Sequence, residues 1–190
     1  METKRARLFL DANILFAAQL RALLLALAEN GTIDVHWSDD VQREWAEALA
    51  AKRPELAASI VRAQAAMADA FPEAAVQNYK HRVAQFELPD PDDRHVVAAA
   101  ASAACPIILT FNLRDFPDAA LTPHGLIAMH PDTFLAGLMS ADAKSLVFAA
   151  ATARDLLKNP AIAPDRYLAN LARLGLEKTA LLLAAYQDAI

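Results

Sequence analysis

The chain alternates between short apolar runs, which suit strands, and longer segments in which apolar residues recur at helical spacing. The apolar runs that predict strands are residues 7–11, 32–37, 106–110 and 125–129. The segments that predict helices are residues 14–29, 39–52, 54–70, 91–104 and 131–139. Strands that alternate with helices imply a parallel sheet covered on both faces. We therefore expect an α/β protein with three α/β/α layers around a central parallel sheet.

The last part of the chain has only helical patterns. Three further helices are expected, at residues 141–158, 164–173 and 176–189, with breaks at Asn159-Pro160 and Gly175. Between the strand-rich segments, residues 76–86 are compatible with one more helix. We expect residues 1–139 to form one domain and residues 140–190 to form a helical C-terminal extension packed on that same domain.

The composition describes a folded chain without disulfides. It has 190 residues, of which 56% are hydrophobic and 22% charged, with 4 glycines; this suits a sizeable core and argues against disorder. The single cysteine, Cys105, excludes an internal disulfide and suits a reducing cytosol, so we expect a cytoplasmic protein with Cys105 in the core. The apolar segment 14–27 is interrupted by Gln19 and Arg21, so we expect no membrane partner.

The formal net charge of −5 argues against a large basic surface for nucleic acid. With 4 glycines the chain has no Gly-rich phosphate loop, and its five histidines do not have zinc-ligand spacing. Any chemistry on phosphate groups therefore needs positive charge from another source, such as a metal ion.

One carboxylate lies on the face of a predicted helix that is expected to be buried. Asp90 suits an N-cap and Pro91 the first helical position, so Asp92 and Asp93 fall in the first turn. The apolar residues whose spacing puts them on the same face as Asp93 are Val96, Val97, Ala100 and Ala104. A charged group on a buried face needs a neutralising partner. Periodicity favours Asp93 over Asp92 as the functional acid, and Asp92 stays open as the alternative.

Three other acids have similar positions. Asp11 ends an apolar strand, and Asp115 follows another one after a short turn. Glu44 lies on the inner face of the helix that Ser38 can cap. The carboxyl ends of parallel strands form one functional edge of a sheet, so these acids are expected to gather there.

Four close carboxylates require an explanation. Two of them about 5 Å apart, at an effective dielectric of about 20, repel each other by roughly 3 kcal/mol. Four of them in one cleft would oppose folding by more than the usual stability of a domain, about 5–15 kcal/mol. The cluster must therefore be protonated, hydrated or neutralised by a cation, and oxygen-only ligands indicate Mg²⁺ or Mn²⁺.

These residues resemble the PIN domain family, and in particular the VapC-like toxins of bacterial toxin–antitoxin systems. The resemblance covers roughly residues 7–139. Its matching pieces are Leu8–Ile14 (LFLDANI), Glu44, Asp92–Ala98 (DDRHVVA), Leu109–Pro117 (LTFNLRDFP) and His130–Leu135 (HPDTFL).

The resemblance implies a metal-dependent endoribonuclease that hydrolyses RNA phosphodiester bonds with water activated by Mg²⁺ or Mn²⁺. The residues that match the family's catalytic and metal-binding acids are Asp11, Glu44, Asp93 and Asp115. The residues that match supporting positions are Asn13, Thr110 and Asn112, with Asp92 as a further candidate. Arg94, Arg114 and His95 flank the acids and are candidates for contact with RNA. Solvent-exposed positions would explain the two arginines equally well, and for His95 an exposed position on the helix is the favoured interpretation.

The resemblance also implies partners: an RNA substrate, a cognate antitoxin protein and a second copy of the chain in a homodimer. Two other functions stay open. A haloacid-dehalogenase-like phosphohydrolase would have its acids at strand ends, but it would need an aspartate at position 13, where this chain has Asn13. A non-catalytic PIN-like binding module would keep the fold without turnover.

Overall fold

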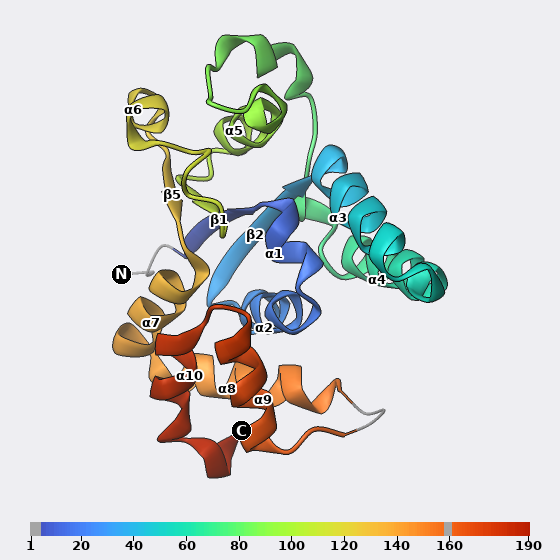
Figure 1. Ribbon diagram of the computed structural model, residues 1–190. Coiled ribbons are helices and arrows are strands. Elements are labelled where there is room, and N and C mark those ends of the chain that lie inside the picture. The colour runs from blue at the N-terminus through green and yellow to red at the C-terminus, as the bar shows by residue number, and fades with distance from the viewer. Residues whose placement is uncertain (1–4, 158–160) are drawn as a thin grey trace. The chain divides into compact units, whose positions relative to one another are not determined.

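The computed structural model describes residues 5–157 and 161–190 (Figure 1). Its sheet has five strands, all parallel, in the order β3-β2-β1-β4-β5. The strands are β1 (Ala6–Leu10), β2 (Ile33–Ser38), β3 (Ala75–Val76), β4 (Ile107–Leu109) and β5 (Ile127–Met129). This all-parallel sheet, with helices between successive strands, confirms the expected α/β class and the three-layer α/β/α fold.

The register of the sheet brings two strand ends together. Leu10 of β1 pairs with Leu109 of β4, and the amide of Asp11 donates to the carbonyl of Leu109 at 3.1 Å. Asp11 and Thr110 therefore follow their strands side by side. The buried apolar residues of both strands keep this pair of strands in the centre of the sheet.

The chain divides into two compact units. The first, which we call the sheet unit, comprises residues 6–16 and 34–129. Its α-helices are α1 (Ala12–Phe16), α3 (Asp39–Lys52), α4 (Ala57–Ala70), α5 (Arg94–Ser102) and α6 (Asp118–Leu121). Its 3-10 turns are η1 (Pro54–Leu56), η2 (Pro72–Ala74), η3 (Lys80–Gln85), η4 (Pro91–Asp93) and η5 (Thr122–His124).

Two predicted caps start the helices that carry the candidate acids. The Ser38 hydroxyl accepts from the amide of Val41 at 3.2 Å and opens α3. The Asp90 carboxylate accepts from the amide of Asp92 at 2.9 Å and opens the turn η4, which leads into α5. Each cap satisfies an N–H group that has no partner within its helix.

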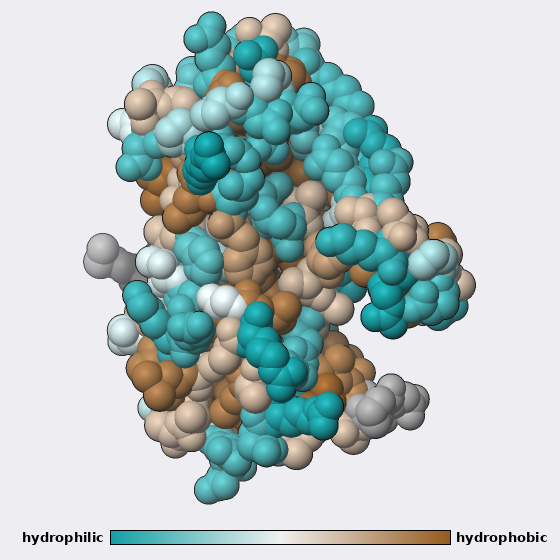
Figure 2. Space-filling view, in the orientation of Figure 1, coloured by the Kyte–Doolittle hydropathy of each residue, from teal (hydrophilic) through white to brown (hydrophobic). Residues whose placement is uncertain are grey.

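The second, which we call the helical unit, comprises residues 17–33 and 130–190 together with Arg5, as far as they are described. Its α-helices are α2 (Ala18–Glu29), α7 (Pro131–Ala141), α8 (Ala143–Asp155), α9 (Pro164–Arg173) and α10 (Glu177–Ala184), and the turn η6 (Gln187–Ala189) follows α10. Brown, apolar surface lies over the region of α7 and α10 in Figure 2. On α10 the side chain of Leu181 is exposed.

A buried carboxylate joins α7 to α10 within the helical unit. Asp132 accepts from the hydroxyl of Thr179 at 2.7 Å, from its amide at 2.8 Å and from the amide of Lys178 at 3.0 Å. These contacts satisfy the first N–H groups of α10, for which Asp132 acts as a cap from a distant part of the sequence. Figure 1 shows α10 beside α7.

Several expected elements differ in detail. The helix expected at 14–29 is divided at Ala17, whose backbone is extended. The segment 76–86 was expected to be helical, which is wrong in part: it begins in the edge strand β3 and contains only 3-10 turns. The helix expected at 91–104 ends at Ser102, because Ala104 has a positive φ of 51° and does not continue the buried stripe.

Other expectations concern burial and boundaries. Trp37, Trp45 and Cys105 all lie in the core as expected. The break expected at Asn159-Pro160 lies outside the described residues. The boundary between residues 139 and 140 stays a prediction. In the described chain no helix is both long enough and apolar enough to cross a membrane.

Candidate active site

Asp11 is held at the carboxyl end of β1 with 6% of its surface exposed. Its carboxylate accepts from Asn13 Nδ2 at 2.6 Å, from Thr110 Oγ1 at 2.7 Å and from the amide of Ala12 at 2.7 Å. Burial raises the pKa of Asp11, and the charge of Glu44 adds to this, although the hydrogen bonds from Thr110 and Ala12 oppose it. The carboxylate is thus fixed in position while its charge is costly.

Asn13 and Thr110 connect the ends of β1 and β4. Asn13 Nδ2 also donates to Thr110 Oγ1 at 2.9 Å, and Asn13 Oδ1 accepts from the amide of Phe111 at 3.1 Å. The amide of Asn112 donates to Thr110 Oγ1 at 2.9 Å. All three predicted supporting residues therefore belong to one network around Asp11.

Asp93 is half-buried at the last position of η4. Burial is the largest cause that raises its pKa, to about 6, and the charges of Asp11, Asp90 and Asp115 raise it further. The charges of the two other predicted acids, Asp11 and Asp115, therefore both act on Asp93. Asp115 is additionally hydrogen-bonded to the side chain of Asn112.

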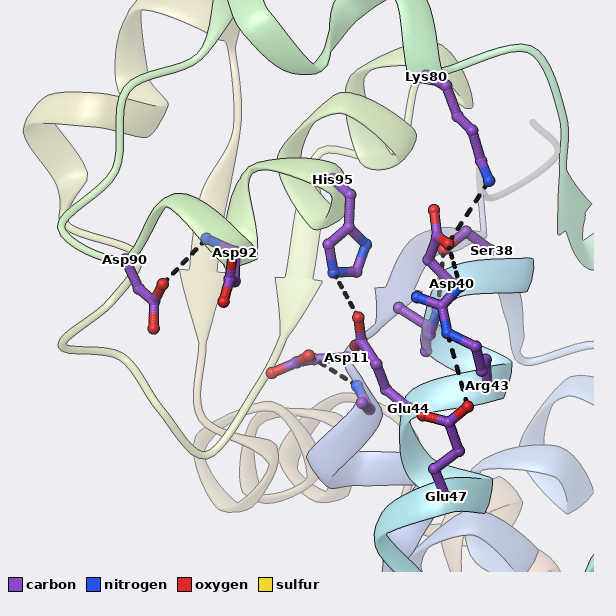
Figure 3. A network of polar contacts seen from close by, with 12 residues as sticks. Asp11, Ser38, Asp40, Arg43, Glu44, Glu47, Lys80, Asp90, Asp92 and His95 are labelled. Atoms are coloured by element: carbon purple, nitrogen blue, oxygen red, sulfur yellow. Dashed lines mark hydrogen bonds and ion pairs between the residues drawn. The ribbon is translucent and has the colours of Figure 1, made fainter.

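Glu44 extends from α3 toward the start of α5, where it meets His95 (Figure 3). His95 Nε2 lies 2.9 Å from Glu44 Oε1. Burial lowers the pKa of His95, but the hydrogen bond and charge of Glu44, together with the charges of Asp40 and Asp11, outweigh this and raise it. An exposed histidine was the alternative expectation here, and it is wrong: only 13% of the side chain is accessible.

A second polar group, beside Glu44 on α3, was not predicted from sequence (Figure 3). Asp40 accepts from the Tyr79 hydroxyl at 2.5 Å, and it pairs with Arg43 at 3.0 Å and with Lys80 at 3.5 Å. Burial alone would raise the pKa of Asp40, but the Tyr79 hydrogen bond and the nearby cations lower it. No local pattern marks Asp40, because its partners Tyr79 and Lys80 lie far along the chain.

The remaining candidates lie around these acids. Asp92 is exposed, whereas Asp93 is half-buried and is acted on by the charges of Asp11 and Asp115, so Asp93 remains the preferred candidate. Arg114 is exposed, as a residue that meets RNA would need to be. Arg94 is only partly exposed, and its buried Nε has no hydrogen-bond partner among the described residues.

The donor set fits a hard divalent cation in chemical type. All four acids offer oxygen ligands, and a cation among them would offset the repulsion that raises the pKa of Asp93. With the side chains as they stand, however, no group of three or more acids, histidines or cysteines within residues 5–157 and 161–190 is arranged to hold an ion. A metal ion would have to draw the carboxylates closer together.

Comparison with models of known protein families shows to which family this chain belongs. The model of the PIN domain matches residues 7–114, which is more than half of the chain. The chain therefore belongs to the PIN domain family. The matched segment includes Asp11, Glu44 and Asp93 and ends just before Asp115. A second model, the VapC50 C-terminal domain, matches residues 131–185.

One named relative is a VapC protein, in agreement with the expected resemblance to VapC-like toxins. The Mycobacterium tuberculosis protein named "Putative ribonuclease VapC50" is 54% identical over 43 residues, which make up 23% of this chain and 25% of that protein. The chain thus matches about a quarter of the length of this curated relative. No solved structure matches the chain.

Proposed function

We propose that this protein is a metal-dependent endoribonuclease and the toxin of a type II toxin–antitoxin pair. The observation that carries the proposal is the grouping of acids around Asp93 and Asp11: the charges of Asp11 and Asp115 both act on Asp93, and the charge of Glu44 acts on Asp11. Family membership and the name of the relative add support for the ribonuclease activity.

A bound Mg²⁺ or Mn²⁺ would supply a Lewis acid that activates water and offsets the charge of the phosphate. In this proposal Asp11, Glu44, Asp93 and Asp115 would hold the ion, directly or through water. Asn13 and Thr110 would orient the Asp11 carboxylate through the hydrogen bonds described above. Glu44 would in turn be oriented by His95. Arg114, which is exposed, would meet RNA phosphates.

The experiment is an RNA cleavage assay with the purified chain in Mg²⁺, in Mn²⁺ and with excess chelator. We expect cleavage that requires the cation and disappears in the Asp11→Asn variant. Asp118→Asn is the matched control, because Asp118 is an exposed acid on α6. Full cleavage in the chelator would overturn the metal mechanism. Cation-bound protein without any cleavage would favour the non-catalytic binding module.

The partners belong to the same proposal. We expect a homodimer, and an antitoxin whose segment in contact with the acids is basic, because a cationic side chain would offset their repulsion. Sedimentation of the purified chain tests the dimer, and co-purification with the product of an adjacent gene tests the antitoxin. A monomer at high concentration that captures no adjacent gene product would contradict both expectations.

A further inference from the structure

A pocket of about 420 Å³ lies within the sheet unit, on the side of α3 away from the acids. It is formed by residues of β2, α3 and α4 and of the segment that leads into β3. This volume lies in the range of small-molecule sites in proteins. None of the functions discussed above uses this pocket.

One wall of the pocket is formed by aromatic side chains. Trp37, at the end of β2, is 3% exposed and meets Phe71 edge to face, with ring centroids 6.2 Å apart and ring planes at 83°. Pro72 follows Phe71 directly and disfavours a helical conformation for the backbone of Phe71. Part of the Phe71 ring remains accessible, so a flat ligand in the pocket has a surface on which to stack.

The opposite wall carries two amides whose orientation is determined. Gln42 Oε1 accepts from Trp45 Nε1 at 2.7 Å; since an indole nitrogen only donates, the Gln42 Nε2 group is the one left for a ligand. Gln64 Nε2 donates to the carbonyl of Gln42 at 2.8 Å, which leaves Gln64 Oε1 as an acceptor. The pocket therefore offers one fixed donor and one fixed acceptor.

The charge of the lining determines what kind of ligand fits. Asp39 is the one ionised side chain among the lining residues, all of which are described, and it adds a second acceptor. A phosphate would meet this carboxylate and no cation, which is unfavourable. A neutral, planar ligand with two donors and one acceptor on its edge would satisfy all three groups. Among the RNA bases, guanine has this combination on its pairing edge.

The pocket is close enough to the acids to hold part of the same RNA strand. Gln42 and Glu44 are two residues apart on α3 and therefore point to opposite sides of the helix. The two sites are separated by about one helix diameter, roughly 10–12 Å. Resting on the proposed ribonuclease function, we propose that this pocket binds a guanine base of the RNA substrate, near the bond that is cleaved.

The test is equilibrium binding of fluorescent octameric RNAs to the Asp11→Asn variant, which removes cleavage from the measurement. The octamers are uridine runs with one central G, A or C. We expect the G octamer to bind most tightly. Gln64→Leu should reduce that preference by about three- to tenfold, since one hydrogen bond to the base is lost. Gln85→Leu, at an exposed glutamine outside the pocket, should leave it unchanged.

A second variant addresses stacking. Phe71→Leu keeps an apolar side chain but removes the ring, so it should weaken binding of all octamers by about tenfold, while Phe71→Tyr should not. Equal binding of the G, A and C octamers, or a G preference that survives Gln64→Leu, would overturn the guanine site, and unchanged affinity in Phe71→Leu would contradict stacking on Phe71. Failure of the wild type to cleave any RNA with added cation would instead count against the proposed function.

Discussion

His95 Nε2 lies 2.9 Å from Glu44 Oε1 and joins the start of α5 to the middle of α3. This contact fixes Glu44, the candidate acid that comes from the middle of a helix. The other ring nitrogen, Nδ1, is buried and has no hydrogen-bond partner among the described residues. The histidine therefore owes its orientation to Glu44.

This contact makes stability depend on pH. The folded-state pKa of His95 is above its usual value of 6.5, because Glu44, Asp40 and Asp11 outweigh the effect of burial. The stabilisation is therefore complete below pH 6.5 and is lost as pH rises through the folded-state pKa. Without metal, Tm should fall from pH 6 to pH 9 by about 2–4 °C, which corresponds to about 1 kcal/mol. In His95→Phe this fall should be absent; an unchanged fall in thermal melts would contradict the assignment.

The Asp93→Asn variant should show whether Asp93 is a metal ligand or an acid that only stabilises the start of its helix. The folded-state pKa of Asp93 is raised to about 6 by burial and by the charges of Asp11, Asp90 and Asp115, so its ionisation costs stability as pH rises from about 4 to about 6. At pH 7 without metal the variant should be about 1 kcal/mol more stable, after allowance for solvent screening. Its cleavage activity should fall by orders of magnitude.

The change in Tm on addition of Mg²⁺ tests the same variant independently of its cleavage activity. Added Mg²⁺ should raise the Tm of the wild type through binding to the folded state and should raise that of Asp93→Asn much less. Asp92→Asn is the matched control, since Asp92 is exposed and adjacent; it should behave like the wild type. If Asp92→Asn loses activity and Asp93→Asn keeps it, the choice between these two acids is reversed.

Thr110 can be tested with a matched pair of substitutions. Its buried hydroxyl donates to Asp11 and accepts from Asn13 Nδ2 and from the amide of Asn112. Thr110→Val keeps the shape but leaves these partners unsatisfied, so it should cost about 1–3 kcal/mol in chemical denaturation and reduce cleavage. Thr110→Ser keeps the hydroxyl and should retain most of both. A larger loss in Thr110→Ser than in Thr110→Val would mean that the methyl group, rather than the hydroxyl, matters.

Asp132 should be a stability residue of the helical unit without a role in catalysis. Asp132→Ala leaves the buried amide and hydroxyl of Thr179 unsatisfied, so it should destabilise the protein by about 2–3 kcal/mol. Burial alone would raise the pKa of Asp132, but its hydrogen bonds from Thr179 and Lys178 lower it, so its stabilisation is present above pH 3.8 and is lost as pH falls through the folded-state pKa. Thermal melts from pH 7 to pH 3 would show a larger loss in the wild type than in the variant.

The sequence was sufficient for features that depend on short spacings. Alternating apolar runs predicted the parallel sheet, and helical periodicity put Asp93 on the inner side of its helix, where the structure has it half-buried. The caps at Ser38 and Asp90 were also predicted, because a cap involves only residues within one turn. Strand ends in a parallel sheet share an edge, so the strand pattern alone predicts that Asp11 and Thr110 lie at the same edge.

Only the tertiary structure determined which distant side chains meet. The partner of Glu44 is His95, that of Asp40 is Tyr79, and that of Asp132 is Thr179; each pair joins elements far apart in sequence. Periodicity states which face of a helix is buried but not which residue covers it. Strand β3 was missed because two residues carry too little pattern. The orientation of the Gln64 amide likewise depends on a hydrogen bond between two packed helices, α3 and α4, and no sequence spacing encodes such a bond.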